Sequence, residues 1–116
     1  MENKTIAKYL RIFALAFIFI VFGLWEIFNP QYWAGFVPQF AASIFNALIL
    51  VRIHGVVLSL TALWLVSGKK RKYAAILSSL IMLEIVISLL VSTGFSDLLV
   101  RDIVILILAI SLIFEN

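Results

Sequence analysis

The chain has 116 residues, of which 65% are hydrophobic and 13% charged, with a formal net charge of +3. Soluble domains carry about 25% charged residues, so this composition, with a mean hydropathy of +1.19, excludes an ordinary soluble protein and indicates one membrane domain over residues 1–116. The chain has no cysteine and one histidine, which excludes disulfides and thiolate metal sites and argues against any metal site built on histidine clusters.

The first predicted helix spans about residues 10–28, an apolar run whose charges are Arg11 and Glu26. A helix of this length measures roughly 28 Å, close to the thickness of the hydrocarbon core. Asn29-Pro30 ends the helix because proline lacks an N–H group and pushes the preceding residue out of the α region. A cleaved signal peptide has a shorter apolar core and a small-residue cleavage site, so we expect this helix to be retained.

Glu26 is the residue of the first helix that requires an explanation, because a carboxylate in the membrane costs a few kcal/mol unless it finds a partner or water. Gly23 and Ala16 lie on the same helical face as Glu26. Small residues on one face allow a neighbouring helix to approach closely. We therefore expect Glu26 to belong to a buried polar cluster at a helix–helix contact.

The segment from Asn29 to Phe40 is irregular, since Pro30, Gly35 and Pro38 interrupt it. Its aromatic residues are of the types that lie at headgroup level, so we expect it to fold along the outer membrane interface or to dip back into the protein. Residues 39–50 form either a short interfacial helix or the first turns of the second membrane helix.

The second predicted helix spans about residues 51–67 and places Arg52 on a stripe of small and polar residues, which suits a bundle interior. His54 lies on a different side of this helix from Arg52. We interpret His54 as a hydrogen-bonded structural residue in preference to a residue that binds a ligand or carries a proton. The basic run Lys69–Lys72 follows. Between two apolar segments such a run indicates a cytoplasmic turn, and no nucleic-acid partner is expected.

The third predicted helix spans about residues 73–93, with Glu84 near its middle and Ser88 one turn further on the same face. A short turn leads to the fourth helix, about residues 98–114, which begins with Arg101 and Asp102. The basic N-terminal segment, with Lys4, Lys8 and Arg11, and the Lys69–Lys72 turn are separated by two helices, so both lie on one side, which should be cytoplasmic. The fold class is therefore an all-α, antiparallel, transmembrane four-helix bundle, multi-pass in the cell membrane, with both termini cytoplasmic.

This topology gathers the ionisable residues in the central-to-outer half of the bundle. The predicted polar cluster consists of Glu26, Arg52, His54, Glu84, Arg101 and Asp102. Each arginine can pair with a carboxylate, which leaves one acid over. Either a protonated His54 faces that acid, or the acid is neutral, and we choose Glu84 because it is the deepest in the membrane. The cluster either fixes helix register or forms a ligand pocket or proton path.

These residues resemble a known family. The sequence Phe22-Gly23-Leu24-Trp25-Glu26 followed by Pro30, Arg52 before the glycine of the second helix, the basic loop, Glu84, and Arg101-Asp102 are similar to the pattern of the DoxX family. The resemblance covers nearly the whole chain. It implies a small four-helix membrane protein related to the quinone-reducing membrane subunits of thiosulfate oxidation, or to components of membrane oxidoreductase complexes.

Two functions follow as expectations. The first is an accessory subunit of a membrane oxidoreductase system that binds a quinone or a lipid, with Trp25 and Trp33 lining the pocket and a partner redox protein supplying electrons. The second is a non-catalytic membrane chaperone, scaffold or assembly factor whose polar cluster is structural. The sequence contains no motif for a resident cofactor and leaves open whether the chain is an enzyme. It also permits a homo-oligomer without requiring one.

Overall fold

The computed structural model describes residues 3–115, and this part of the chain is helical throughout, with connecting turns and no strand. The all-α prediction is confirmed. The helices are α1 (Asn3–Phe28), α2 (Pro30–Trp33), the 3-10 helix η1 (Ala34–Phe36), α3 (Gln39–Ala42), α4 (Ala47–Ser67), α5 (Arg71–Ser92) and α6 (Asp97–Ile113).

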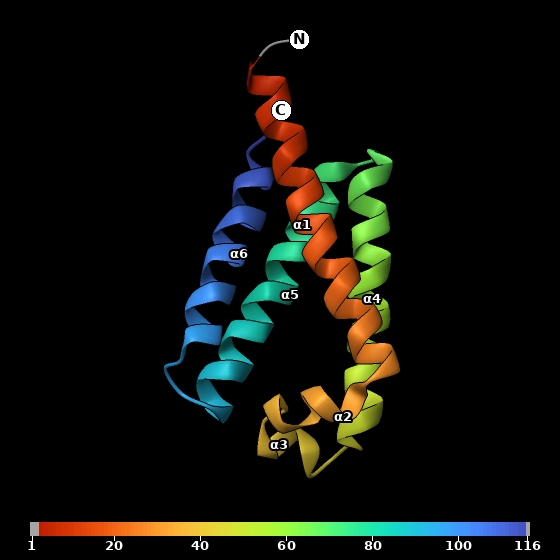
Figure 1. Ribbon diagram of the computed structural model, residues 1–116, viewed down its shortest axis with the longest axis vertical. Coiled ribbons are helices and arrows are strands. Elements are labelled where there is room, and N and C mark those ends of the chain that lie inside the picture. Colours follow the sequence, from red (N-terminus) through yellow and green to blue (C-terminus); the bar gives the residue numbers. More distant parts are fainter. Residues whose placement is uncertain (1–2, 116) are drawn as a thin grey trace.

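The four long helices form two antiparallel pairs, α1 with α4 and α5 with α6, and the short helices α2 and α3 lie beneath the end where the pairs separate (Figure 1). The first and last described residues lie at the opposite end. There Arg11 and Glu115 form an ion pair of 2.9 Å, and Arg11 also donates a hydrogen bond to Ser111. This contact joins the start of α1 to the end of α6.

Local sequence signals determine most helix boundaries. Pro30 occupies the first position of α2 and prevents α1 from continuing. The side chain of Asn46 caps α4 by accepting hydrogen bonds from the backbone N–H groups of Leu48 and Ile49. Gly68 ends α4 in the left-handed conformation, with a φ of 82°, which glycine adopts without steric cost.

Two helix starts differ from the prediction. α1 begins at Asn3 instead of about residue 10, because the polar N-terminal residues include good helix formers such as lysine, which extend the helix beyond its apolar part. For residues 39–50 the sequence left two alternatives, a short separate helix or the first turns of the second membrane helix, and the structure contains a part of each. Gln39–Ala42 form the short helix α3, the chain then turns, and Ala47 to Leu50 form the first turn of α4.

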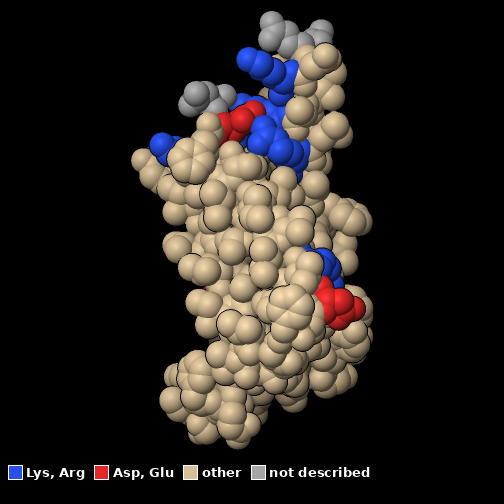
Figure 2. Space-filling model, turned by 90° about the vertical axis from the view of Figure 1, so that its left-hand side faces the viewer, with Lys and Arg blue, Asp and Glu red and all other residues tan. Residues whose placement is uncertain are grey.

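Three helices, α1, α4 and α5, are long and apolar enough to cross a membrane, whereas α6 has 17 residues and is shorter than the others. Large apolar side chains are exposed along all four long helices, among them Phe17, Leu60, Leu80 and Ile107. Figure 2 shows most of the lysine and arginine of this face gathered at the end that carries the termini. The broad surface below is uncharged apart from one small patch of basic and acidic side chains at its edge. Such an apolar surface is typical of a protein that contacts lipid.

The packed core occupies the half of the bundle near the termini. Its buried residues come from the first half of α1, the second half of α4, the first half of α5 and the second half of α6. Ala74, Ala75 and Ser78 of α5 are completely buried there. Their small side chains allow the two helix pairs to approach closely at this end, whereas the other halves of the same helices surround a cavity.

Candidate functional site

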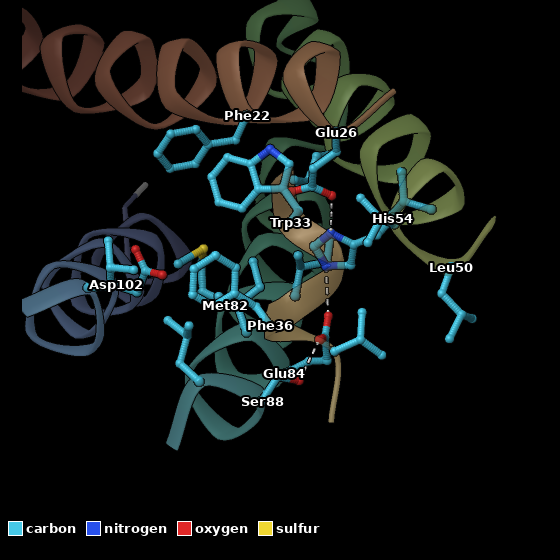
Figure 3. Close-up of a pocket in the computed structure, with 18 of the residues that line it drawn as sticks. Phe22, Glu26, Trp33, Phe36, Leu50, His54, Met82, Glu84, Ser88 and Asp102 are labelled. Carbon is cyan, nitrogen blue, oxygen red and sulfur yellow. Dashed lines mark hydrogen bonds and ion pairs between the residues drawn. The ribbon is translucent and has the colours of Figure 1, made fainter. Parts of the chain in front are cut away.

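The half of the bundle farther from the termini contains a cavity of about 570 Å³. Its walls come from the second half of α1, the first half of α4, the second half of α5 and the start of α6. The segment after α1 covers one side, with Trp33, Phe36 and Pro38 among the lining residues. The cavity is mainly apolar, and its charged side chains lie at a few points of the wall (Figure 3).

His54 bridges two carboxylates in the wall of this cavity. Its Nδ1 atom lies 2.8 Å from Oε1 of Glu26, and its Nε2 atom lies 2.8 Å from Oε1 of Glu84 (Figure 3). The second oxygen of Glu84 accepts a hydrogen bond of 3.1 Å from Ser88. We call Glu26, His54 and Glu84 the carboxylate–histidine triad. It connects α1, α4 and α5.

A close crossing of α1 and α4 brings Glu26 to His54. Gly23 and Gly55 face one another at this crossing, and a Cβ atom added to Gly23 would lie 2.7 Å from the carbonyl oxygen of Gly55. A Cβ atom added to Gly55 would lie 2.9 Å from Cβ of Glu26. Because glycine has no side chain, the two backbones can approach far enough for Glu26 to reach the residue beside Gly55.

The triad holds two protons in its hydrogen bonds. A carboxylate can only accept and a ring nitrogen can donate or accept, so each 2.8 Å contact requires one proton between its two atoms. The two protons can both reside on the imidazole, or one of them can reside on a carboxyl group, and both arrangements carry one net negative charge. Together with Ser88, the triad therefore forms a continuous hydrogen-bonded chain across three helices.

The three acids of the cluster differ in how far the rest of the described chain covers them. The side chains of Glu26 and Asp102 are 9% and 5% exposed, whereas the side chain of Glu84 is 54% exposed. Glu84 lies near the middle of α5, and other parts of the described chain cover only about half of its side chain. Glu84 is therefore the exposed member of the hydrogen-bonded chain, and Glu26 is the buried member.

Arg101 and Asp102 form a separate pair on the α6 side of the cavity. The Nε atom of Arg101 donates to Oδ1 of Asp102 at 2.9 Å, and the guanidinium group lies 4.9 Å from the ring centre of Phe22. Arg101 thus pairs with a carboxylate, as expected, but the partner is its neighbour in sequence. The favourable cation–π contact holds the start of α6 against α1.

The expectation that Arg52 pairs with a carboxylate of the cluster is wrong. Arg52 is exposed, and among residues 3–115 it has no hydrogen bond or ion-pair partner. Arg52 and His54 are separated by about 200° around the helix axis, so the rotation that directs His54 into the cavity directs Arg52 away from it. Histidine takes the place that the sequence analysis gave to arginine.

The two tryptophans predicted to line the pocket have different positions. Trp33 lines the cavity, and Trp25 lies behind it, with ring centres 5.2 Å apart in an edge-on contact. Sequence reasoning did not identify Phe36 and Pro38 as cavity residues. The Pro and Gly residues of that segment indicated an irregular connection, but they do not reveal that it folds over a cavity.

Both ring nitrogens of His54 are engaged by carboxylates, so the triad leaves no free nitrogen for a metal ion. In the part of the chain that the structure describes, no group of three His, Cys, Asp or Glu side chains has an arrangement that would hold a metal ion. A comparison with known protein families, curated proteins and solved structures finds no match to this chain. The resemblance to the DoxX family therefore stays an expectation from sequence motifs.

Proposed function

We propose that this chain is a DoxX-like integral membrane protein with four spanning helices, and that its cavity binds a quinone or a related lipid-like amphiphile. In this proposal it is an accessory subunit of a membrane oxidoreductase system, and a partner redox protein supplies the electrons. The cavity carries the proposal. Small-molecule sites have volumes of roughly 300–1,000 Å³, with mostly apolar walls and a few convergent polar groups, and a cavity of about 570 Å³ with these features lies between the helices.

The position of the charged groups supports a ligand with a polar head. The triad and the Arg101–Asp102 pair occupy different walls of the cavity, and the remaining lining is largely aliphatic and aromatic. A quinone presents a flat ring with oxygen atoms on opposite sides and an apolar tail, which matches polar groups at separated points of an apolar wall. The exposed Glu84 and the chain of hydrogen bonds to Glu26 would let protons reach a ligand in such a cavity.

The proposed topology places the end with the termini in the cytoplasm. The start of α1, which carries Lys4, Lys8 and Arg11, and the turn between α4 and α5 with its basic run lie toward this end (Figure 1). Basic side chains gather there (Figure 2), and an excess of Lys and Arg is typical of cytoplasmic loops. α6 measures about 26 Å, slightly less than the hydrocarbon thickness of about 30 Å, and a short span is accommodated by thinning of the bilayer. Its apolar residues and its position beside α5 support a fourth span.

Labelling of single-cysteine variants tests this topology. The natural chain has no cysteine that would give background labelling. We expect a membrane-impermeant maleimide to label Phe95→Cys on intact cells, and to label Lys70→Cys and Phe114→Cys only after the cells are opened. All three positions are exposed in the structure. Labelling of Phe114→Cys on intact cells would show that α6 does not cross the membrane, and the four-span proposal would fail.

Ligand binding is tested with purified protein in lipid nanodiscs and a benzoquinone carrying a decyl tail, titrated by calorimetry in its oxidised and reduced forms. We expect saturable binding to the natural chain and a loss of roughly tenfold or more in affinity, about 1.4 kcal/mol, for Ile85→Trp, which fills the cavity. Ile87→Trp is the matched control, since Ile87 is exposed on the same helix and is not a cavity residue. Absence of saturable binding to the natural chain would contradict the proposal.

A non-catalytic scaffold or assembly factor is the second candidate, and one observation favours it: His54 joins three helices through two hydrogen bonds, which is also what a structural residue does. The two candidates differ in the binding experiment. A scaffold requires no saturable quinone site, and filling the cavity with Ile85→Trp would leave its partner interaction intact.

A further inference from the structure

A second hollow lies on the surface of the bundle between α1 and α4, and it shares no lining residue with the cavity of the triad. Its volume is about 340 Å³, and every residue that lines it is apolar. Phe13 and Phe17 line it from α1, and Leu63 and Val66 line it from α4. These four residues are between 43% and 68% exposed. We call this hollow the α1–α4 groove.

The groove exists because α1 and α4 separate beyond their close crossing. Gly23 faces Gly55 at the crossing, and the two helices diverge from there toward the end with the termini (Figure 1). Ala16 and Ala62 each lie about two helical turns from the glycine of their own helix, so they are level with one another in this antiparallel pair. Both alanines are buried and line the groove, and their small side chains form its floor.

Positive charge lies at the wide end of the groove. Tyr9 is one helical turn before Phe13 on the same face of α1, and its side chain is exposed. The guanidinium carbon of Arg71 lies 5.7 Å from the centre of the Tyr9 ring, and Nζ of Lys8 lies 6.0 Å from it. Since Arg71 follows the turn after α4, both helices that form the groove end beside cationic side chains.

Arg71 is held in place and still has donors to offer. Its Nε atom donates to the carbonyl oxygen of Leu65 at 2.9 Å, while its guanidinium group lies over the ring of Tyr9. The two terminal nitrogens have no hydrogen bond or ion pair with any of residues 3–115, and the described chain does not enclose them. A guanidinium group with both terminal nitrogens available can bind a phosphate through two parallel hydrogen bonds.

We propose that the α1–α4 groove binds an acyl chain of an anionic phospholipid and that Arg71 contacts the phosphate of this lipid. An acyl chain suits an entirely apolar groove, and basic pockets beside membrane helices bind anionic head groups. Tyrosine is typical of the headgroup level, which places Tyr9 and Arg71 where the phosphate lies when the chain runs along the groove. The bound lipid fills the space between α1 and α4 and so stabilises the folded chain. This site does not depend on the proposed quinone cavity.

Three lipids with identical acyl chains separate recognition of the chain, the phosphate and the net charge: diacylglycerol, phosphatidylcholine and phosphatidylglycerol. A ligand that binds the folded state raises the melting temperature of the detergent-solubilised protein, and native mass spectrometry counts the lipids retained. We expect one retained phosphatidylglycerol, bound about tenfold more tightly than diacylglycerol, with phosphatidylcholine between the two. This comparison uses the natural chain and requires no variant to fold.

Two variants test the two parts of the site. Arg71→Gln should weaken phosphatidylglycerol about tenfold and change diacylglycerol by less than about twofold, whereas Val66→Trp fills the groove and should weaken both about tenfold. Lys72→Gln removes an equal charge from the next residue, and Val56→Trp changes a valine of α4 that is similarly exposed but lies outside the groove. In about 0.5 M salt, which screens distant charges, both controls should bind like the natural chain.

Three results would each overturn this inference. Equal binding of the three lipids by the natural chain would show that neither the phosphate nor the charge is recognised. Unchanged lipid binding by Val66→Trp would show that the lipid lies outside the groove. A lipid-free dimer that Val66→Trp dissociates would show that a second copy of the chain occupies the groove. None of these results changes the outcome of the quinone titration with Ile85→Trp, so the two proposals can fail separately.

Discussion

Replacing His54 with leucine should lower the free energy of unfolding by about 1–3 kcal/mol, because the substitution leaves the buried carboxyl group of Glu26 without a hydrogen-bond partner. Glu26 is 7% exposed, and His54 is its only hydrogen-bond partner among residues 3–115. Leucine also removes the contact to Glu84 and with it the link between α4 and α5. Thermal and denaturant unfolding of the purified protein in detergent would measure the loss.

Glu84→Gln is the matched control for this prediction. It changes the other carboxylate bound to His54, but glutamine still offers an oxygen that can accept a hydrogen bond from the ring, so the loss should stay within about 1 kcal/mol, the usual net value of one hydrogen bond. A large difference between the two variants would show that the buried half of the triad holds the helices together. Unfolding curves for His54→Leu that coincide with those of the natural chain would contradict the arrangement of the triad.

Gly55→Ala should destabilise the protein by about 1–3 kcal/mol, the usual cost of inserting a methyl group into a close-packed contact. The added Cβ atom would lie 2.9 Å from Cβ of Glu26 and close to the carbonyl oxygen of Gly23, and backbone atoms cannot move aside as a flexible side chain can. The helices must separate, and Glu26 then moves away from His54. Both the melting temperature and the affinity for the decyl-tailed quinone should therefore fall.

Gly35→Ala provides the comparison. A Cβ atom added to Gly35 meets no atom within 4 Å, and this residue lies in the segment that covers the cavity. Surface substitutions of this kind usually change stability by less than about 0.5 kcal/mol. Equal behaviour of Gly35→Ala and Gly55→Ala would show that the crossing of α1 and α4 is looser than its geometry indicates.

The triad combines two roles that are usually considered as alternatives. The same two hydrogen bonds that join α1, α4 and α5 also connect an exposed carboxylate to a buried one in the cavity wall. A residue whose removal destabilises the protein can therefore also affect ligand binding. For this reason the proposed function is tested with Ile85→Trp, which changes the cavity without breaking the triad.

Much of the helical organisation could be predicted from the sequence, because its determinants are local. Apolar length, the proline at position 30, the basic run Lys69–Lys72 and the glycine at position 68 act on their own segment of chain. The close packing expected on the face of Gly23 also agrees with the structure, since small residues on a helical face can be recognised in isolation.

The sequence alone therefore predicted an all-helical chain of four apolar segments with ionisable residues within them, and three of the four helices in the structure are long and apolar enough to cross a membrane. Only the tertiary structure decided which of these residues meet. The rotation of α4 brings His54 into the wall and turns Arg52 outward, and the crossing at Gly23 and Gly55 sets the distance to Glu26. Contacts of this kind depend on the rotation and separation of whole helices, and neither quantity is encoded in any single segment.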